Sequence, residues 1–270
     1  MRDELGDRMK KNYENRTRIL LPRRTYTIIR IDGKAFHTYT RGCVRPFDDG
    51  LIEDMDATAC YICKNVQGAK FAFVQSDEIS ILMTDFEKIG TDAWFDGNIQ
   101  KIVSVAASMA TAKFNQLRFM RKFNSPSVSY NADAILSIID VTKLAEFDAR
   151  TFTIPMDVEV ENYFIWRQQD CVRNSISSVA QSLYSQRELA GKNMSQQQDM
   201  IHEKGQNWND YAPKYKRGRF IFKQSFEKEI ILQKDELKDS VCIRTAWVSD
   251  ECPTFTQDRD FLYSRIPKDL

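Results

Sequence analysis

The stretch IIRIDGKAFHTYTRG, residues 28–42, contains the end of an apolar run and the residues that follow it. The run is rich in isoleucine and ends in one aspartate, Asp32, which a glycine, Gly33, follows at once. β-Branched residues that stop at a glycine indicate a strand, so residues 25–32 are predicted to form one with Asp32 at its tip. An aspartate in this place either begins a turn or provides half of a metal site. A second carboxylate beside it would favour the metal site.

The patterns downstream predict a small unit that alternates strands and helices. Apolar residues at spacings of three and four predict helices, and short β-branched or aromatic runs between turn residues predict strands. The turn between the second and third strands is a tight Ser-Asp pair. In chain order we expect a strand over 25–32, a helix over 48–66, strands over 70–75 and 78–84, a helix over 97–118 and a strand over 149–155.

This order of elements suggests a ferredoxin-like βαββαβ sheet, which belongs to the α+β class. A right-handed first crossover makes the first two strands parallel, and the third strand fits between them and is antiparallel to both. The tip of the first strand then lies at the same edge of the sheet as the hairpin. Asp32 is therefore predicted to fall beside Asp77 and Glu78, so a second carboxylate can reach the first.

The second half of the chain has a different pattern. We expect a catalytic domain over residues 1–155 and a helical and β-ribbon extension over 156–270, packed on it in one compact chain. The further predicted elements are a polar helix over 3–18, one long helix or a broken pair over 157–188, a short helix over 195–204, and a β-ribbon from the runs 219–226 and 241–248.

The composition excludes several classes of protein. Thirty-nine basic and 38 acidic residues give a net charge of +1, so binding to a nucleic acid requires local basic patches rather than overall charge. No apolar run approaches the roughly 20 residues of a membrane span, and the acidic start of the chain does not resemble a transit peptide. Six cysteines in 270 residues do not make a disulfide scaffold and are expected to be buried and reduced. We expect a soluble protein of a reducing compartment, the cytoplasm.

Carboxylates gathered at one sheet edge suit Mg²⁺, which prefers oxygen ligands and shares them with substrate phosphates. Two such ions would clamp the attacking and leaving oxygens of a phosphoryl displacement. Gly33 adds a backbone carbonyl ligand and lets a triphosphate approach closely. The amides of residues 34–37 are expected to cradle phosphates. The candidate charge partners of a triphosphate are Lys34, Arg45 and Lys101. Spacing alone leaves open that Asp32 only begins a turn and that Asp77 is only a hairpin aspartate.

Five motifs, in order, resemble those of the tRNA(His) guanylyltransferase family and of its Thg1-like branch, the 3′-to-5′ nucleotide polymerases. They are RIDGKAFHTYTRG, QSDEISIL, WF followed after five residues by KIVSVAAS, FDAR and WRQQDC. The resemblance covers roughly residues 5–220. It implies a polymerase-like palm that activates an RNA 5′-monophosphate with ATP or GTP. The 3′-hydroxyl of an incoming nucleoside triphosphate then attacks the activated end. A homotetramer is also implied.

The resemblance assigns roles to residues of this chain. Asp32 and Asp77, with the Gly33 carbonyl, would hold two Mg²⁺ ions, and Glu78 would support this catalytic site. His37 is expected to pack or to lie near a phosphate rather than to act as a base. Arg150, in FDAR, resembles a further basic contact. The nucleotide-binding set would be Asp32, Gly33, Lys34, Ala35, Phe36, His37, Arg45, Ser76, Asp77 and Lys101.

One segment departs from the pattern of the eukaryotic enzymes. These continue WRQ-DC with HINNLYNT, whereas this chain has VRNSISSV from Val172 onward. The part linked with adding a non-templated guanylate to tRNA(His) is thus missing, which favours templated repair of truncated tRNA 5′ ends. Asp170, Arg173 and Asn174 share a helix face and would contact RNA or nucleotide, or else pack against a subunit.

Two basic stretches are candidates for contacts with an RNA backbone. One is KYKRGRFIFK, with Lys214, Lys216, Arg217 and Arg219, and the other is KFNQLRFMRKF over residues 113–123. Ordinary solvated faces explain either stretch equally well.

Three rival functions remain open at this stage. The nearest is a tRNA(His) guanylyltransferase that adds the extra 5′ guanylate. Another is a catalytically dead palm that only binds RNA, against which the clustered carboxylates argue because they are costly to keep without a use. The third is a nucleotide cyclase, which would act on free nucleoside triphosphate. The sequence leaves open which tRNA is used, and whether ATP or GTP activates it.

Overall fold

A computed structural model describes residues 3–124, 143–230 and 240–268 of the chain. Its centre is one sheet with the strand order β4-β1-β3-β2-β5-β6, in which every neighbouring pair is antiparallel. β3 lies between β1 and β2, so the ferredoxin-like arrangement is confirmed. The strands are β1 Tyr26–Gly33, β2 Ala69–Gln75, β3 Glu78–Met83, β4 Phe147–Ile154, β5 Arg219–Ile230 and β6 Ser240–Glu251.

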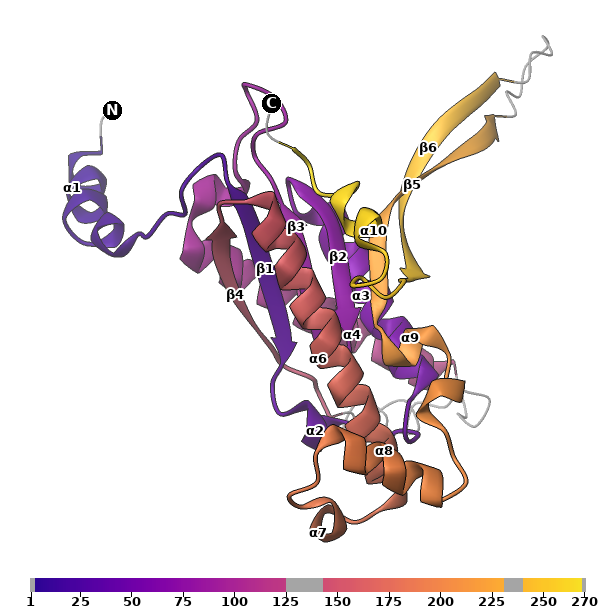
Figure 1. The fold of residues 1–270 in the computed structure, drawn as a ribbon. Helices are drawn as coiled ribbons and strands as arrows, with labels where there is room; N and C mark the ends of the chain where they lie inside the picture. Colours follow the sequence, from indigo (N-terminus) through magenta and orange to yellow (C-terminus); the bar gives the residue numbers. More distant parts are fainter. Residues whose placement is uncertain (1–2, 125–142, 231–239, 269–270) are drawn as a thin grey trace.

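Helices cover both faces of this sheet, with α3 and α4 on one side and α6 on the other (Figure 1). The α-helices are α1 Glu4–Asn12, α2 Phe36–Tyr39, α3 Asp49–Asn65, α4 Ile99–Phe123, α6 Asp157–Leu183, α7 Gln186–Leu189, α8 Met194–Glu203, α9 Pro213–Lys216 and α10 Arg259–Tyr263. Short 3₁₀ turns stand at Glu14–Thr17, Trp94–Gly97 and Trp208–Asp210. None of the described helices combines the length and the apolar character that crossing a membrane requires.

Side chains of β1 alternate between two cores because successive strand residues point to opposite faces. Ile29 and Ile31 pack in the core under α3 and α4, and Tyr26 and Ile28 pack in the core under α6. At the end of the strand, Asp32 falls on the α6 side, beyond the apolar positions of that face. The alternation therefore brings a carboxylate to the sheet edge without burying it in either core.

Two predicted helices have different ends in the structure. The amino-terminal helix stops at Asn12, and a 3₁₀ turn follows, because α1 buries no residue and tertiary packing does not extend it. α4 runs to Phe123, beyond the predicted residue 118, because Arg118 and Arg121 of its last turns form ion pairs with buried Asp54 on α3.

The long helix over the second half is a broken pair, one of the two forms predicted. α6 runs without a break to Leu183, and a new helix, α7, begins at the Ser185 capping box. The β-ribbon predicted from the last third is present as β5 and β6, which pair over 12 register positions from Arg219↔Glu251 to Ile230↔Ser240. The sequence also predicts a loop at NSPSVSYNAD and a solvated segment at FEKEIILQKDELKD, but residues 125–133 of the first and 231–239 of the second lie outside the described residues.

The extension predicted over 156–270 is joined to the same sheet as the first half. β5 pairs with β2 from Phe71↔Phe222 to Val74↔Arg219, so the sheet continues across the expected boundary. α6 packs on the face of the strands that the first half provides. Residues from both halves therefore meet at the sheet edge where β1 ends.

The described cysteines are free thiols, as expected, but they are not uniformly buried. Cys63, Cys171 and Cys252 are buried, whereas Cys43, Cys60 and Cys242 are half-buried. Spacing along helices predicted which residues face the core, but it did not predict how completely each is covered.

Candidate functional site

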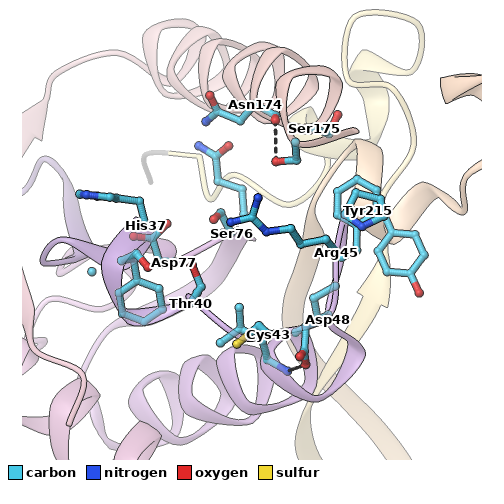
Figure 2. Close-up of a pocket in the computed structure, with 18 of the residues that line it drawn as sticks. His37, Thr40, Cys43, Arg45, Asp48, Ser76, Asp77, Asn174, Ser175 and Tyr215 are labelled. Atoms are coloured by element: carbon cyan, nitrogen blue, oxygen red, sulfur yellow. Dashed lines mark hydrogen bonds between the residues drawn. The ribbon is translucent and has the colours of Figure 1, made fainter. Parts of the chain in front are cut away.

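A pocket of about 560 Å³ lies at the sheet edge where β1 ends and the β2–β3 hairpin turns (Figure 2). Its size falls in the range of small-molecule sites. Its wall is built by the tip of β1, α2, the start of α3 and the hairpin turn on one side, and by α6 and α9 on the other. Asp32 and Asp77 both line it.

The structure brings the two predicted carboxylates together, and Gly33 shows how closely. A Cβ added to Gly33 would lie 2.8 Å from Asp77 Oδ2 and 2.2 Å from Cδ2 of Phe36. Asp77 therefore rests against the backbone that follows Asp32, and only a glycine fits between them. Neither carboxylate forms an ion pair with a lysine or arginine in the described part of the chain.

Burial and like charge make ionisation of this pair unfavourable. Burial raises the pKa of Asp77 to about 6, against hydrogen bonds from Ser76 and its own backbone, and the nearby charge of Asp32 adds to the rise. Burial also raises the pKa of Asp32, with the charges of Glu78 and Asp148 acting in the same direction. A cation placed between two such carboxylates relieves both costs.

The two carboxylates suit Mg²⁺ better than a metal ion whose ligands all come from the protein. Among residues 3–124, 143–230 and 240–268, no group of three or more His, Cys, Asp or Glu side chains could hold a metal ion. Mg²⁺ is usually held by one or two carboxylates and completes its shell with water and substrate phosphates. Asp32, Asp77 and the adjacent Gly33 backbone therefore fit Mg²⁺ that is shared with a phosphorylated substrate.

The backbone around the carboxylates adopts conformations that side-chain-bearing residues rarely take. Ala35 has φ +51° and Ser76 has φ +45°. Positive φ at a non-glycine residue costs free energy and is found at sites that the surrounding structure constrains. Both strained residues line the pocket and stand within three residues of an aspartate of the pair.

The predicted phosphate cradle over residues 34–37 is only partly available. The Lys34 amide donates to the Glu146 carbonyl at 2.8 Å, so it is already used. The first bonds inside α2 run from Thr38 and Tyr39 to the Ala35 carbonyl. The amides of Ala35, Phe36 and His37 thus precede the internal bonds of the helix. The Phe36 ring is buried in the core, so this residue offers only its backbone.

Of the predicted cationic partners, Arg45 is the one placed in the pocket, and its side chain reaches into it in Figure 2. Lys34 lies outside the lining and donates to Glu146 at 2.6 Å in an exposed pair. His37 lines the pocket and its Nε2 lies 3.0 Å from Thr38 Oγ1. An exposed ion pair such as Lys34–Glu146 contributes little to stability, and a ligand can easily replace one of its partners.

Glu78 does not lie among the pocket residues. Its side chain is buried and accepts from Arg167 through both oxygens, at 2.7 Å from Nε and 2.6 Å from Nη2. Ser80 Oγ donates to it as well, at 3.1 Å. Both oxygens of the carboxylate are therefore engaged, and the ion pair ties the β2–β3 hairpin to α6. Because both oxygens are engaged, direct contact of Glu78 with a metal ion or substrate is not supported, and its predicted supporting role, through the hairpin that carries Asp77, stays a prediction.

Lys101 was predicted to contact the triphosphate, but the structure places it at the opposite end of the sheet. β3 runs away from the hairpin, so α4 begins at the far end, where Leu20 bridges to Asn98. Lys101 Nζ lies there, 6.0 Å from the centre of the Phe95 ring. The predicted topology already contained this information, because the helix after the third strand must start at the far edge.

Replacing Lys101 by alanine is expected to change the KM for nucleoside triphosphate by less than about twofold, because an exposed side chain remote from the pocket makes no contact there. Arg45→Ala is expected to raise the KM about tenfold or more, because one charge-assisted contact to phosphate is lost. Steady-state kinetics on both variants checks the pair. A large effect of Lys101→Ala would mean that this residue serves a pocket other than that of its own chain.

The predicted face of α6 is present and partly lines the pocket. Asp170 accepts from Arg167 and Arg173, each at 2.9 Å, and from Asn174 at 3.4 Å. Asn174 lines the pocket, whereas Arg173 and Asp170 do not. Arg150 lies on β4 beside its ion-pair partner Asp148, at 3.6 Å and outside the pocket.

The basic stretch over 214–223 is largely tied into the fold rather than free for RNA. Lys214 donates to Asp49 at 2.7 Å. Lys216 is buried and donates to the Asn209 carbonyl at 2.6 Å. Arg219 is buried too, and Arg217 is half-buried. Lys216 and Arg219 are therefore not surface cations, which corrects their predicted place in an exposed basic patch. In the other stretch, Arg118 and Arg121 are committed to Asp54.

Sequence reasoning missed several residues of the pocket wall. Phe47 and Tyr215 stack with ring centres 4.7 Å apart and planes at 10°, and both line the pocket. Tyr215 stood out in the sequence only as an aromatic residue inside a basic run. The other lining residues that sequence reasoning missed include Thr40, Cys43, Asp48, Ser175, Ser178 and Gln181.

Comparison with known proteins gives one consistent result. Residues 6–155 match the family described as tRNAHis guanylyltransferase (Thg1). The chain is 28% identical to the uncharacterized protein R259 of Acanthamoeba polyphaga mimivirus, over 88% of this chain and 82% of that protein. It is 25% identical to the tRNA(His) guanylyltransferase of Schizosaccharomyces pombe, over 81% of this chain and 80% of that protein.

Solved structures agree with this result. A bacterial tRNA(His) guanylyltransferase (Thg1)-like protein in complex with ATP is 43% identical, with a TM-score of 0.78 over 97% of this chain and 99% of that one. A structure titled as the same kind of protein in complex with GTP gives a TM-score of 0.75 at the same identity and coverage. The chain belongs to the tRNA(His) guanylyltransferase family of nucleotidyltransferases.

Proposed function

We propose that this protein is a metal-dependent enzyme that adds nucleotides to the 5′ end of tRNA in the 3′-to-5′ direction. In this proposal ATP or GTP first activates a 5′-monophosphate, and templated addition then repairs a truncated end. The observation that carries the proposal is the pair Asp32 and Asp77, brought together at a pocket of nucleotide size. A 43% identical bacterial relative is known in complexes with ATP and with GTP.

The residues at the sheet edge would hold the nucleotide and its metal. Asp32, Asp77 and the Gly33 carbonyl would bind two Mg²⁺ ions, which neutralise phosphate charge and lower the pKa of an attacking hydroxyl when bound. Arg45, Ser76 and the amides of residues 35–37 would contact the phosphates. This assignment leaves Lys34 as an exposed cation at the mouth and omits Lys101 and the side chain of Glu78.

We further propose the division into a catalytic palm over 1–155 and an extension over 156–270 that supplies the opposite wall of the pocket. Asn174, Ser175 and Ser178 of α6 line this wall. Val172 packs against the core formed with Ile176, where the eukaryotic motif has its histidine. An apolar residue there supports templated repair over recognition of tRNA(His).

A second candidate is addition of the extra guanylate to tRNA(His), which the names of the curated relatives favour. One assay separates the two. A 5′-monophosphorylated tRNA that lacks its first nucleotide is incubated with ATP, all four nucleoside triphosphates and Mg²⁺. Addition of the nucleotide that pairs with the opposing 3′ strand supports repair. Addition of guanylate alone, and only to tRNA(His), supports the second candidate. Binding of tRNA without any extension would overturn both.

The expected assembly is a homotetramer, and the expected compartment is the cytoplasm. Light scattering during gel filtration of the purified chain measures the assembly directly. A monomer at micromolar concentration would contradict it.

The pKa of Asp77 predicts how metal binding depends on pH. Protonated Asp77 is a poor ligand, so the Mg²⁺ affinity is expected to fall as the pH falls through about 6. The pKa is raised in the folded state, so the metal-free fold binds a proton that the unfolded chain has released. The contribution of Asp77 to stability is therefore greatest below pH 4 and declines, by about 1–3 kcal/mol, as the pH rises from about 4 to about 6.

Calorimetric titration with Mg²⁺ from pH 5 to pH 8 and thermal unfolding in EDTA from pH 4 to pH 8 check this prediction. Asp77→Asn is the control, because the amide does not titrate and its profiles should lose this component. A Mg²⁺ affinity that is constant over this range would contradict the assignment of Asp77 as a ligand.

A further inference from the structure

Arg219, the first residue of β5, is a buried cation. Its ion pair leaves one guanidinium nitrogen without a hydrogen-bond partner in the described part of the chain. Its side chain is 5% exposed. Nε donates to Asp56 Oδ1 at 2.8 Å. The other oxygen of Asp56 accepts from Ser249 Oγ at 2.7 Å, so this carboxylate does not take a second bond from the guanidinium. Among the described residues, Arg219 Nη2 is buried and has no hydrogen-bond partner.

Other arginines in this chain show what a purely structural arrangement looks like. Arg167 forms a two-bond fork with Glu78 and bonds Asp170 as well. Arg121 does the same with Asp54 and adds Glu53. A buried charged donor without an acceptor costs free energy, so folds normally satisfy it. Arg219 departs from this pattern at Nη2, as Arg30 and Arg118 do at Nε, but of these three arginines only Arg219 lines the pocket of the candidate site.

Arg219 also lines the pocket of the candidate site. Among the described residues, the lysines and arginines that line it are Arg45, Lys214 and Arg219, and Lys214 is already paired with Asp49. A pocket wall with an unused, desolvated guanidinium favours an anion that presents several oxygens, and phosphate suits the planar fork of arginine.

The position in the sheet separates this cation from the carboxylate pair. The strand order runs β1, β3, β2, β5, so Arg219 stands three strand spacings from Asp32, about 14 Å at the usual spacing. Val74 is the register partner of Arg219, and Asp77 lies in the turn beyond it. A phosphate bound by Arg219 would therefore lie on the β5 side of the pocket, away from Asp32.

We propose that Arg219 is the cation of a second phosphate subsite on the β5 side of the pocket, oriented by Asp56. The group it binds is a phosphate of the RNA 5′ end or of a second nucleotide, both of which the reaction proposed above requires. The identity of the ligand thus rests on that function, whereas the subsite itself rests on the geometry of Arg219. Asp56 is a positioning residue, because it holds Nε and leaves Nη2 without a hydrogen-bond partner within the described ranges.

The test compares pairs of ligands that differ only in phosphate, in EDTA so that no metal contributes. The pairs are 5′-monophosphorylated and 5′-hydroxyl forms of one tRNA, and GTP and guanosine. Equilibrium dissociation constants are measured for the wild type, Arg219→Met, Arg219→Lys and Asp56→Asn. Arg217→Met is the matched control, because Arg217 is two residues away, half-buried and outside the pocket lining.

The wild type is expected to prefer the phosphorylated partner of at least one pair about tenfold or more, as one charge-assisted contact supplies. Arg219→Met should lose that preference, Arg219→Lys should keep part of it, and Arg217→Met should keep all of it. The pair that loses its preference identifies the source of the phosphate. An unchanged preference of Arg219→Met in both pairs would overturn the proposal.

Asp56→Asn separates binding from a structural role. The amide oxygen still accepts from Nε, so the fold is retained while the ion pair is lost. If Arg219 only stabilised the fold, Asp56→Asn and Arg219→Met would lower the unfolding temperature and the phosphate preference together. The proposal requires Arg219→Met to lose much more of the preference than Asp56→Asn does. Because EDTA removes any metal, a failure of 5′ addition in the assay above leaves this result readable by itself.

Discussion

Asp77→Asn and Asp32→Asn should each reduce 5′ nucleotide addition at least about a hundred- to a thousandfold, the scale of removing one main electrostatic group from an active site. Asparagine keeps the shape of aspartate and removes its charge, so the metal loses a ligand while the strand tip and the hairpin stay in place. In EDTA the Asp77→Asn variant should be at least as stable as the wild type at pH 8, because a poorly solvated charge is gone. Single-turnover rates and thermal unfolding measure the two effects.

Asp148→Asn is the control for this prediction. Asp148 is the register partner of Asp32 on β4, but its side chain is 62% exposed and it does not line the pocket. Its replacement is expected to change the rate by less than about threefold, as for most exposed substitutions. If Asp77→Asn retains wild-type rates, the metal assignment is wrong. If Asp32→Asn, Asp77→Asn and Asp148→Asn lose activity equally, the loss reflects the change in net charge and not a specific role of the Asp32–Asp77 pair.

Glu78→Ala is expected to lower the free energy of unfolding by about 3–5 kcal/mol, the cost of removing one partner of a buried ion pair. The loss arises because Arg167 then keeps a buried charge with only Asp170 to meet it, and because Ser80 loses its acceptor. Urea unfolding of the wild type, Glu78→Ala, Arg167→Met and the double variant measures it. The double variant should lose less than the sum of the single losses.

Asp170→Ala is the comparison for this ion pair, because Asp170 bonds the same arginine but is partly exposed, and it should cost about 1 kcal/mol. If the Glu78→Ala protein regains activity at a lower temperature, where its fold is more stable, the role of Glu78 is structural. A Glu78→Ala protein that unfolds like the wild type yet requires far more Mg²⁺ would return Glu78 to the metal site.

The site could be predicted as far as chain topology determines it. A β-branched run ending in Asp32, a hairpin turning at Asp77 and the order of elements were enough to place these residues at one edge. Topology also places the start of α4 at the far end, and choosing Lys101 for its positive charge did not take strand direction into account. Local patterns and simple connection rules therefore account for the palm and its carboxylates.

Partners distant in sequence account for what could not be predicted. Glu78 is engaged by Arg167, 89 residues away, and Arg219 by Asp56, 163 residues away. Lys216 looked like a surface cation, yet it is buried over Trp208. A basic residue in a basic run reads as exposed until the fold shows which carboxylate or carbonyl it meets. No spacing rule contains that information.

α6 has a consequence for how ligands meet this protein. The 27-residue helix contains neither proline nor glycine, and it is anchored in two separate cores, by Val160 and Phe164 near its start and by Ile176 and Val179 near its end. The pocket wall at Asn174 lies between these two anchors, so it cannot swing without unpacking a core. A ligand that enters this pocket therefore meets one wall that is already in place, and little of its binding free energy is spent on ordering that wall.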